Sequence, residues 1–457
     1  MKTIRIGNAA GFWGDQMDAP RLLCEGVRLD YLTLEYLAER TMSILAHQRS
    51  RDPNAGYVTH FPTVVESLLP SLKTQPGLRI VTNAGGMNPA ACVRRVGKIL
   101  SAANLDDVPL AMVAGDDLLP DLDTYLAGGE TFAHFETGQP LGELRGKVVS
   151  VNAYLGAVGI VEALSKGARV VITGRVADVS LTVGPAVHEF GWAWDQWDHL
   201  AAATVAGHLI ECGAQATGGM YSDWTEELPL ANVGYPVAEI SDDRSLTITK
   251  AAGTAGSVTT GTVAEQLVYE IGDPAHYLTP DVDADFSEVR LEQAEADRVR
   301  VSGPRGRVAP KRYKVSLAYE DGYMASGTLV IWGRDARQKA QHCAEMIFQR
   351  VRRAGFDLSR TNVECLGSGD SLLGIGPRHE NPWEVVLRVS AHDPSREAVE
   401  RLSRELAPLV TSGPPGVTGY TGARVKPQRV LAYWPTTISR SCVSPCVSVK
   451  SAKEWCA

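Results

Sequence analysis

The sequence lacks long hydrophobic runs, and it lacks an excess of positive charge. No stretch approaches the roughly 20 consecutive apolar residues that a membrane-spanning helix needs, so we expect no membrane partner. Lysine and arginine total 45 against 53 acidic residues, for a net charge of −8. Nucleic-acid binding depends on cations that displace phosphate counterions, and this composition argues against it. Charged residues make up 21% and hydrophobic residues 44%, which excludes a disordered or coiled-coil chain.

Cysteine is infrequent, and its positions do not suggest a disulfide framework. The eight cysteines are scattered along the chain and mostly lie in apolar contexts, which is typical of buried free thiols. Cys442 and Cys446 have no histidine near them, so they provide too few ligands for a zinc site. Residues 1–7 form a strand pattern in place of an apolar signal core. We therefore expect a cytoplasmic protein.

The common cofactor and metal motifs are also missing. The chain contains no G-x-G-x-x-G after its first strand and no G-x-x-x-x-G-K-[ST] phosphate loop. It likewise contains no H-E-x-x-H, no C-x-x-C pair, no G-x-S-x-G and no EF-hand loop. We therefore expect neither a redox cofactor nor a bound metal, although a coenzyme A thioester can serve as the substrate.

Five short apolar runs share one pattern, in which glycine and short polar residues follow the run. Runs of this kind, without alternation, are typical of strands that are buried on both faces of a sheet. Helical patterns over 29–49, 89–101 and 156–166 separate them, which predicts an α/β domain with a parallel sheet and helices on both faces. Because parallel strands present their carboxyl ends at one edge, we expect the polar tips to form one site. The five runs are 4–6, 79–81, 110–113, 148–151 and 169–172.

The composition changes in the last third of the chain. Residues 272–310 are rich in charge, proline and glycine, and we expect a linker or a surface hairpin there. Beyond them, two strands joined at Asp321-Gly322 predict a hairpin, and the elements that follow resemble a ferredoxin-like α+β fold with one extra strand. We therefore expect an α/β domain that carries the site and a ferredoxin-like domain with a C-terminal tail, over 1–305 and 310–457.

Three charged residues follow the third and fifth predicted strands. Asp116 can act as a general base or bind a substrate hydroxyl, and it can equally cap the helix that begins near Leu118. Arg175 lies in a glycine-flanked loop and suits a carboxylate or phosphate, which a guanidinium grips with two hydrogen bonds. Asp178 can orient Arg175 as an ion pair, or the two can simply fix the loop. We expect Arg175 to hold an anionic group and Asp116 or Asp178 to move the proton.

Neutral amides and one acidic residue are the expected substrate contacts. Asn8, Asn83 and Asn152 each follow a predicted strand. Their amide groups both donate and accept hydrogen bonds, which suits a carbonyl or a hydroxyl. Asp15 lies in a loop in which glycines flank two aromatic residues, and such a loop is expected to face a ligand. We therefore expect all four residues to bind substrate.

A glycine-rich loop at 253–257 is a further candidate for substrate binding. It contains Gly253, Thr254 and Ser257, and a predicted helix follows it. Backbone N–H groups in such a loop can bind an anion, even though no lysine follows the glycines as it does in a phosphate loop. We expect this loop to take a phosphate or a carboxylate.

His208, Glu211 and Cys212 lie on one predicted helix that spans 198–212. His208 and Cys212 are four residues apart and share a helix face, so they could form a nucleophilic Cys–His pair. A cysteine on a helix is most often a core residue. An acid or base role for Glu211 is the alternative that we favour.

Six longer motifs follow one another along the chain: Gly7–Asp15, Asn83–Pro89, Gly115–Asp117, Thr173–Asp178, Val187–Trp192 and Gly207–Gly213. Together with Gly413–Gly419, they resemble the acyclic terpene utilisation (AtuA-type) family. The resemblance runs from about residue 3 to 330. It implies a role beside the breakdown of citronellol-type and geraniol-type terpenes as coenzyme A thioesters, and a member can also serve another pathway. It assigns no catalytic residue to this sequence.

The residues and the resemblance together predict an enzyme that acts on a terpenoid, branched acyl-coenzyme A or carboxylate. The expected chemistry is redox-neutral and acid–base, such as hydration, dehydration, lyase cleavage or hydrolysis, with Asn83 and Asn152 polarising a carbonyl. Two alternatives stay open: a non-catalytic partner subunit of a pathway enzyme, and a thioester or amide hydrolase that uses Cys212. The expected partners are a small molecule and further copies of the chain.

Overall fold

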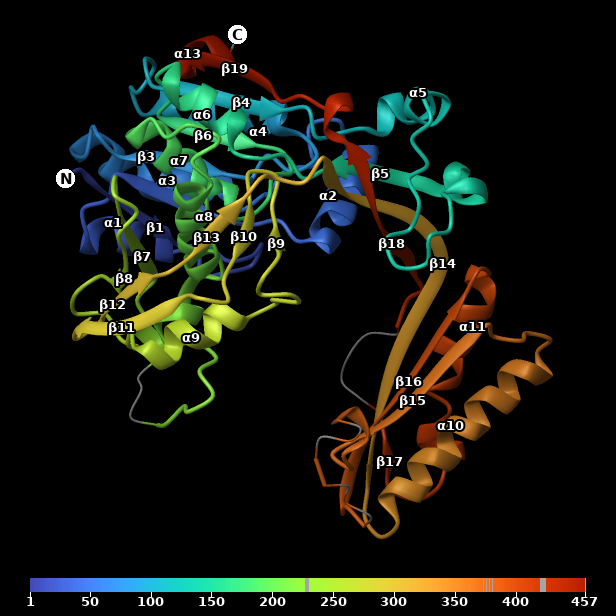
Figure 1. Ribbon diagram of the computed structural model, residues 1–457. Coiled ribbons are helices and arrows are strands. Elements are labelled where there is room, and N and C mark those ends of the chain that lie inside the picture. The colour runs from blue at the N-terminus through green and yellow to red at the C-terminus, as the bar shows by residue number, and fades with distance from the viewer. Residues whose placement is uncertain are drawn as a thin grey trace. The chain divides into compact units, whose positions relative to one another are not determined.

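A computed structural model describes residues 1–226, 230–372, 374, 376–377, 379, 381–419 and 425–456, and the chain divides into two compact units. The first unit contains Met1–Ala318 and Tyr433–Ala457, and the second contains Tyr319–Ala432 (Figure 1). The last residues of the chain therefore belong to the first unit, whereas the sequence patterns predicted that they belong to the second domain.

A ten-stranded mixed sheet forms the centre of the first unit. Its order is β11 (Arg290–Glu295), β12 (Arg298–Ser302), β8 (Leu246–Lys250), β7 (Pro236–Ser241), β1 (Thr3–Asn8), β2 (Tyr31–Leu34), β3 (Arg79–Thr82), β6 (Val170–Thr173), β4 (Pro109–Ala114) and β19 (Cys446–Ser451). The run from β1 to β4 is parallel, and the strands on either side of it pair antiparallel. The predicted α/β class with a parallel sheet is confirmed.

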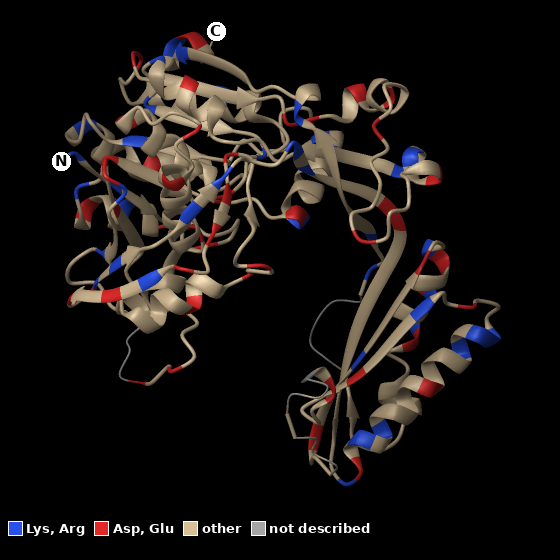
Figure 2. Ribbon diagram, in the orientation of Figure 1, with Lys and Arg blue, Asp and Glu red and all other residues tan. Residues whose placement is uncertain are grey.

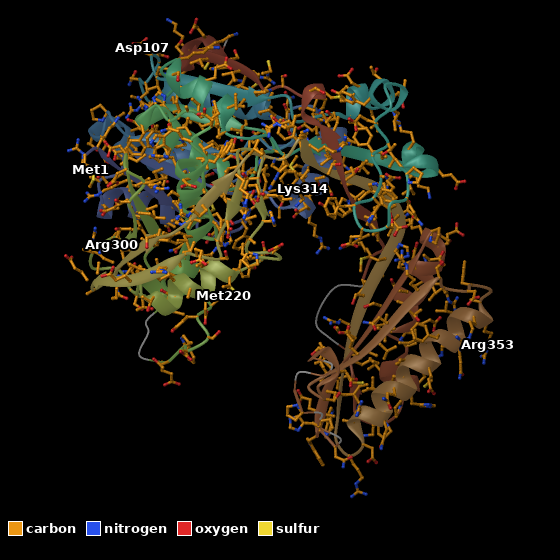
Figure 3. The ribbon with its side chains drawn as sticks, in the orientation of Figure 1. Met1, Asp107, Met220, Arg300, Lys314 and Arg353 are labelled. Carbon is orange, nitrogen blue, oxygen red and sulfur yellow. The ribbon has the colours of Figure 1, made fainter. Side chains whose placement is uncertain are left out.

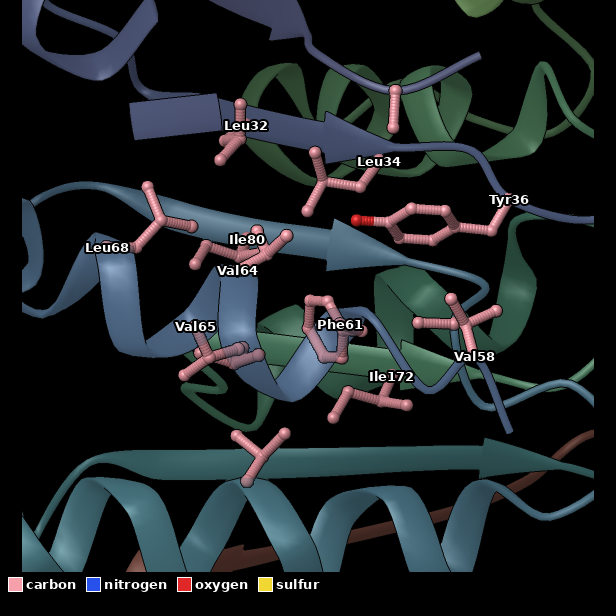
Figure 4. Packing of buried hydrophobic residues seen from close by; sticks show 14 of the residues in the cluster. Leu32, Leu34, Tyr36, Val58, Phe61, Val64, Val65, Leu68, Ile80 and Ile172 are labelled. Atoms are coloured by element: carbon pink, nitrogen blue, oxygen red, sulfur yellow. The ribbon is translucent and has the colours of Figure 1, made fainter. Parts of the chain in front are cut away.

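Helices cover both faces of this sheet. One face carries α1 (Ala19–Gly26), α3 (Phe61–Thr74), α4 (Pro89–Ala102) and α13 (Ala452–Cys456), and the other carries α6 (Val158–Ser165), α7 (Ser180–Phe190) and α8 (Trp197–Glu211). Phe61, Val64 and Leu68 of α3 pack against Leu32 of β2 and Ile80 of β3 (Figure 4). All five side chains are buried, and burial of each contributes about 1.5–3 kcal/mol.

Smaller elements surround the sheet. A three-stranded sheet contains β13 (Arg305–Arg307), β10 (Asp283–Asp285) and β9 (Tyr277–Leu278). The strands β5 (Val148–Ala153) and β18 (Gln428–Ser439) both pair with the long strand β14 (Arg312–Trp332). The remaining helices of this unit are α2 (Glu39–Arg51), α5 (Leu122–Ala127) and α9 (Thr260–Val268). Short 3₁₀-helices cover Leu119–Asp121, Gly142–Lys147, Gly213–Thr217, Leu230–Asn232, Asp370–Leu372 and Arg440–Cys442.

The structure decides three sequence predictions in the first unit. The helix expected over 29–49 is wrong at its start, because Tyr31–Leu34 is strand β2 and α2 begins only at Glu39. All four residues of β2 are buried, and aromatic and β-branched residues favour such a strand. The run 148–151 is a strand, but β5 pairs with β14 and not with the parallel sheet. Within residues 272–310, the linker alternative is wrong and the hairpin alternative is confirmed, because β11 and β12 form an antiparallel hairpin that extends the large sheet.

The second unit has a ferredoxin-like arrangement. Its elements after β14 are α10 (Ala336–Arg353), β15 (Arg360–Leu366), β16 (Glu384–Asp393), α11 (Arg396–Glu405), α12 (Leu409–Ser412) and β17 (Val417–Thr418). The sheet order is β15-β16-β14-β17 with antiparallel pairings, and α10 and α11 pack on it in one hydrophobic core. The predicted hairpin at Asp321-Gly322 is wrong, because both residues lie within the continuous strand β14. One long strand thus replaces the two predicted ones, and β18 pairs with β14 outside the order of these four strands.

Charged residues of both signs are interspersed over each unit (Figure 2). Among the helices that the structure describes, none has the length and hydrophobicity needed to cross a lipid bilayer. All eight cysteines are free thiols. The expectation of burial holds for Cys24, Cys92, Cys343 and Cys365, whereas the three cysteines nearest the C-terminus are exposed.

Candidate functional site

A cavity of about 700 Å³ lies in the first unit, at the carboxyl ends of the parallel strands β1, β2 and β6. The loops after these strands contribute Asp15, Glu35 and Asp178 to its wall. The end of α8, the segment after it, the strand β9 and the start of β14 also contribute to the wall. Figure 3 labels two of the lining residues, Met220 after α8 and Lys314 on β14. A cavity of this size is large enough for a drug-sized ligand.

The wall combines aromatic side chains with an excess of carboxylates. Lys314 is the lysine among the described lining residues, and six carboxylate side chains oppose it: Asp15, Glu35, Glu39, Asp178, Glu211 and Glu270. Aromatic members of the wall are Phe12, Tyr154, Tyr235, Tyr269 and Tyr277. Within the described part of the chain, no three His, Cys, Asp or Glu side chains are grouped so that they could hold a metal ion.

Asp178 lies on the wall between β6 and α7, and Arg175 holds it in place. Arg175 donates to Asp178 Oδ1 at 2.5 Å and to a backbone carbonyl, and its guanidinium carbon lies 4.1 Å from the centre of the Tyr154 ring. Arg175 is 2% exposed and is not among the lining residues, whereas 37% of the Asp178 side chain is accessible. Loss of hydration around the carboxyl group raises the pKa of Asp178, and the charges of Glu211 and Glu39 raise it further. Together they outweigh the opposite effect of Arg175, and the pKa is about 7.

Glu35, at the end of β2, is a second wall carboxyl whose position is fixed by hydrogen bonds. Asn83 Nδ2 donates to Glu35 Oε2 at 2.5 Å, and the N–H of Leu37 donates to Oε1 at 2.8 Å. Asn83 Oδ1 in turn accepts from the N–H of Tyr36 at 2.9 Å. Burial and the charge of Asp178 raise the pKa of Glu35 well above its ordinary value. Asn83 therefore orients a wall carboxyl and is itself fully buried.

Glu39, Lys314 and Tyr154 form a third group on the wall. The Lys314 ammonium and the Tyr154 hydroxyl donate to the same Glu39 Oε1, at 2.9 and 2.8 Å. Lys314 Nζ also lies 4.6 Å from the centre of the Tyr154 ring. Although burial opposes the effect, Lys314 lowers the pKa of Glu39 to about 2, so this carboxylate is ionised at neutral pH. The lysine of the wall is therefore already paired.

Glu211 and His208 meet at the end of α8, beside Cys212. His208 Nδ1 lies 3.1 Å from Glu211 Oε1, and both residues line the cavity. Burial and the charge of Glu211 raise the pKa of the Cys212 thiol to about 12. A nucleophilic cysteine needs a lowered pKa, so this environment does not activate Cys212. The helix ends at Glu211, and the partner of His208 is Glu211, not Cys212.

Asp15 lines the cavity and also closes the loop that carries it. Its Oδ2 accepts from the N–H of Gly11 at 2.8 Å, and its Oδ1 accepts from the Tyr235 hydroxyl. The same loop presents Phe12, which lines the cavity and is 58% exposed. Asp15 therefore contributes charge to the wall while its oxygens hold the Phe12 loop.

Asp116 and Asn152 pair behind the wall and do not line the cavity. Asp116 Oδ2 accepts from Asn152 Nδ2 at 2.8 Å and from the N–H of Arg175 at 2.9 Å. Both side chains are buried, and burial raises the pKa of Asp116 to about 6 against the effect of these hydrogen bonds. The pair joins the end of β5 to the loop after β6, so it supports the segment that carries Arg175.

Asn8 is likewise buried and is not among the lining residues. Its Nδ2 donates to the carbonyl of Ile210 at 2.7 Å and to that of Glu211 at 2.9 Å. These are two of the last carbonyls of α8, which have no intrahelical partner. Asn8 therefore holds the end of α8, and with it Glu211, against the end of β1.

The loop 253–257 does not contribute to the described wall. The N–H of Ser257 donates to a backbone carbonyl at 2.8 Å, and the Thr254 hydroxyl does so at 2.6 Å. Gly253 has a φ of +75°, which allows the chain to turn there. These donors are therefore used within the protein, and the structure does not bring Gly253, Thr254 and Ser257 to the cavity with the other candidates.

Several wall residues that make polar contacts were not predicted from the sequence, among them Glu35, Glu39, Tyr154 and Lys314. The helix expected over 29–49 would place Glu35 and Glu39 on its polar side. With Tyr31–Leu34 recognised as a strand, Glu35 stands at a strand tip like the other candidates. Lys314 reaches the cavity from a distant part of the sequence, and no local pattern marks it.

Comparison with known protein families gives a match over nearly the whole chain. The family described as acyclic terpene utilisation family protein AtuA matches residues 4–449. This span includes every described residue of the cavity wall. No curated protein and no solved structure matches the chain. The family resemblance of the sequence motifs is therefore confirmed.

Proposed function

Because the chain belongs to the acyclic terpene utilisation family, we propose that it is an enzyme of terpenoid or branched acyl metabolism. The proposed reaction is redox-neutral acid–base chemistry in the cavity, in the class that includes hydration, dehydration, lyase cleavage and hydrolysis. Family membership supports the metabolic role, and the cavity wall supports the chemistry. The eight free thiols favour a cytoplasmic location, where disulfides are rare.

The raised pKa and fixed orientation of the Asp178 carboxyl are the main support for this proposal. General acid–base catalysis is most efficient when the pKa of the catalytic group lies near the working pH. Asp178 has a pKa of about 7, is partly open, and is held at 2.5 Å by Arg175. It can therefore accept a proton in one step and return it in the next at neutral pH. Arg175, enclosed behind it, keeps the carboxyl in one orientation.

The charge of the wall supports a substrate whose inserted part is uncharged. Two like charges about 6 Å apart repel by about 3 kcal/mol at an effective dielectric constant of about 20. Lys314 is paired with Glu39, and Arg175 is enclosed behind Asp178 and does not line the cavity, so neither cation offers a free donor to a substrate anion. A free carboxylate would therefore meet net repulsion, whereas an alcohol, an ester or the acyl end of a thioester would not. This favours the thioester form of an acyl substrate over the free acid.

Apolar side chains of the wall support a hydrocarbon portion in the same substrate. Phe12, Met220 and Leu278 line the cavity, and each is more than half exposed. Contact with such side chains removes apolar surface from water on both partners, at about 25 cal/mol per Å². A branched hydrocarbon chain is a suitable group for this contact.

Deuterium exchange tests the proposal whichever of these net reactions the enzyme performs. The purified protein is incubated in D₂O with branched unsaturated acyl thioesters, the matching alcohols and the matching acids. Mass spectrometry then detects water addition, water loss or deuterium uptake at carbon. We expect a signal with a thioester or an alcohol, and loss of at least a hundredfold in rate in Asp178→Asn, the range typical of a removed acid–base group.

The matched control is Asp243→Asn, which makes the same chemical change at an exposed turn. It should keep the wild-type rate. If Asp178→Asn also keeps the wild-type rate while the wild-type protein is active, the assignment of Asp178 is wrong. If only the free acids react, the charge argument is wrong.

A further inference from the structure

The hydrogen bonds of His208 determine where its protons lie. The residue stands in the last turn of α8, and its side chain is 2% exposed. Its Nε2 lies 3.2 Å from the carbonyl oxygen of Leu267. A carbonyl oxygen can only accept a hydrogen bond, so Nε2 must carry a hydrogen. A neutral His208 would then have a bare lone pair on Nδ1.

That lone pair would face a second acceptor. Nδ1 lies 3.1 Å from Glu211 Oε1, and an ionised carboxylate accepts hydrogen bonds but cannot donate them. Two lone pairs at this distance would repel, so the contact requires a proton between the two atoms. We infer that His208 and Glu211 together hold one transferable proton on the cavity wall, with His208 as the imidazolium and Glu211 as the carboxylate.

Shielding from water by the rings of Tyr277 on β9 and Phe286, 5.5 and 5.6 Å from that of His208, disfavours a charge on the ring. The titratable groups on the neighbouring wall are Asp178 before α7, Glu270 after α9, Tyr277 on β9 and Cys212 after α8. The contact with the Glu211 carboxylate and the dipole of α8 favour the imidazolium.

One carboxyl oxygen of Glu211 is left without a hydrogen bond. Within the described chain, its Oε2 is buried and has no hydrogen-bond partner. Gln266 Nε2 donates to the His208 carbonyl at 2.8 Å and holds the end of the helix from the other side. Both residues line the cavity, but the Glu211 side chain is 14% exposed and that of His208 only 2%, so His208 acts through Glu211 and is a positioning residue.

This inference rests on the proposed function for its catalytic consequence. In an elimination, Asp178 takes a C–H proton, and the electrons of that bond form the double bond. The proton held by His208 and Glu211 passes to the leaving hydroxyl, which departs as water. Asp178 ends protonated and the pair ends one proton short, and exchange with solvent resets both. Hydration is the same sequence reversed.

Nitrogen NMR of the histidine-labelled protein tests where the proton lies. The variant Glu211→Gln is the matched comparison, because its amide N–H can donate to Nδ1 of a neutral ring and preserve the contact. His208→Gln identifies the resonance. At neutral pH we expect two protonated nitrogens for His208 in the wild-type protein, and a non-protonated Nδ1 in Glu211→Gln. A non-protonated Nδ1 in the wild-type protein would overturn the inference.

Turnover separates this inference from the proposed function. We expect Glu211→Gln to stay folded and to lose at least a hundredfold in the deuterium or water-transfer assay, in the range of a removed acid or base. Full turnover in Glu211→Gln would make the pair structural and leave Asp178 as the acid–base group. Full turnover in Asp178→Asn would refute the proposed function, while the NMR result on His208 would stand.

Discussion

Replacing Asp116 by asparagine tests whether the buried carboxyl stabilises the fold through its hydrogen bonds alone or also needs its charge. Asp116 is 3% exposed, and its Oδ2 accepts both of its side-chain hydrogen bonds, from Asn152 and from the N–H of Arg175. An asparagine side chain has the same shape, and its single carbonyl oxygen can accept the same two hydrogen bonds. The substitution therefore removes the charge and keeps the contacts.

The magnitude follows from the pKa. Burial raises the pKa of Asp116 from 3.8 to about 6, so ionisation is less favourable in the folded state than in the unfolded state. One pKa unit corresponds to about 1.4 kcal/mol, so the charge costs the folded state about 3 kcal/mol well above pH 6. Wild-type stability should rise as the pH falls from above 6 toward 4, where the folded protein binds the proton and the unfolded chain does not.

Urea unfolding of the whole protein at pH 8 and pH 4 measures the change in the free energy of unfolding of the first unit, with Asp116→Ala as the control. We expect Asp116→Asn to gain up to about 3 kcal/mol at pH 8, and little at pH 4, where the wild-type carboxyl is also neutral. Asp116→Ala leaves two buried donors unsatisfied and should lose about 2–5 kcal/mol at both pH values. If Asp116→Asn is as unstable as Asp116→Ala at pH 8, the charge is needed and the reasoning is refuted.

Three further predictions concern the cavity wall. Cys212→Ala should leave turnover within about twofold, because a thiol with a pKa of about 12 is protonated at neutral pH, and steady-state rates check this. Asn83→Ala removes the donor to Glu35 Oε2 and the acceptor of the Tyr36 N–H, and urea unfolding should show a loss of about 2–4 kcal/mol. Lys314→Met removes the cation that lowers the pKa of Glu39 from 4.5 to about 2. The wild-type stability from this pair is present above pH 4.5 and is lost toward pH 2, so the variant should lose roughly 1 kcal/mol at neutral pH and show a flatter acid limb in thermal melts at low salt.

The parallel strands could be predicted because burial on both faces leaves a clear pattern. The runs 4–6, 79–81, 110–113 and 169–172 are all strands of the large sheet. The strand β2 was missed because its Tyr-Leu-Thr-Leu sequence continues into polar residues whose spacing also fits a helix. The long strand β14 was split because Asp-Gly usually ends a strand, whereas here the pairing of β14 with β16 begins directly after the glycine.

The candidate site was predicted in part, for the same physical reason. Asp15, Asp178 and Glu211 reach the wall because they lie at the ends of elements that meet there. Asp116 and Asn152 also lie at strand ends, but their side chains bond to each other behind the wall. Whether a polar residue at a strand end faces the cavity depends on its side-chain partners from other strands. No local sequence pattern identifies these partners.

Measuring the pKa of the Asp178 carboxyl tests most directly whether Asp178 is the acid–base group of the cavity. Carboxyl carbon NMR of the aspartate-labelled protein, with Asp178→Asn to identify the resonance, gives this value without a substrate. We expect the Asp178 carboxyl to titrate with a midpoint of about pH 7. A midpoint at about 4, the value of an ordinary aspartate, would contradict it, because Asp178 would then be a permanently ionised partner of Arg175 at neutral pH.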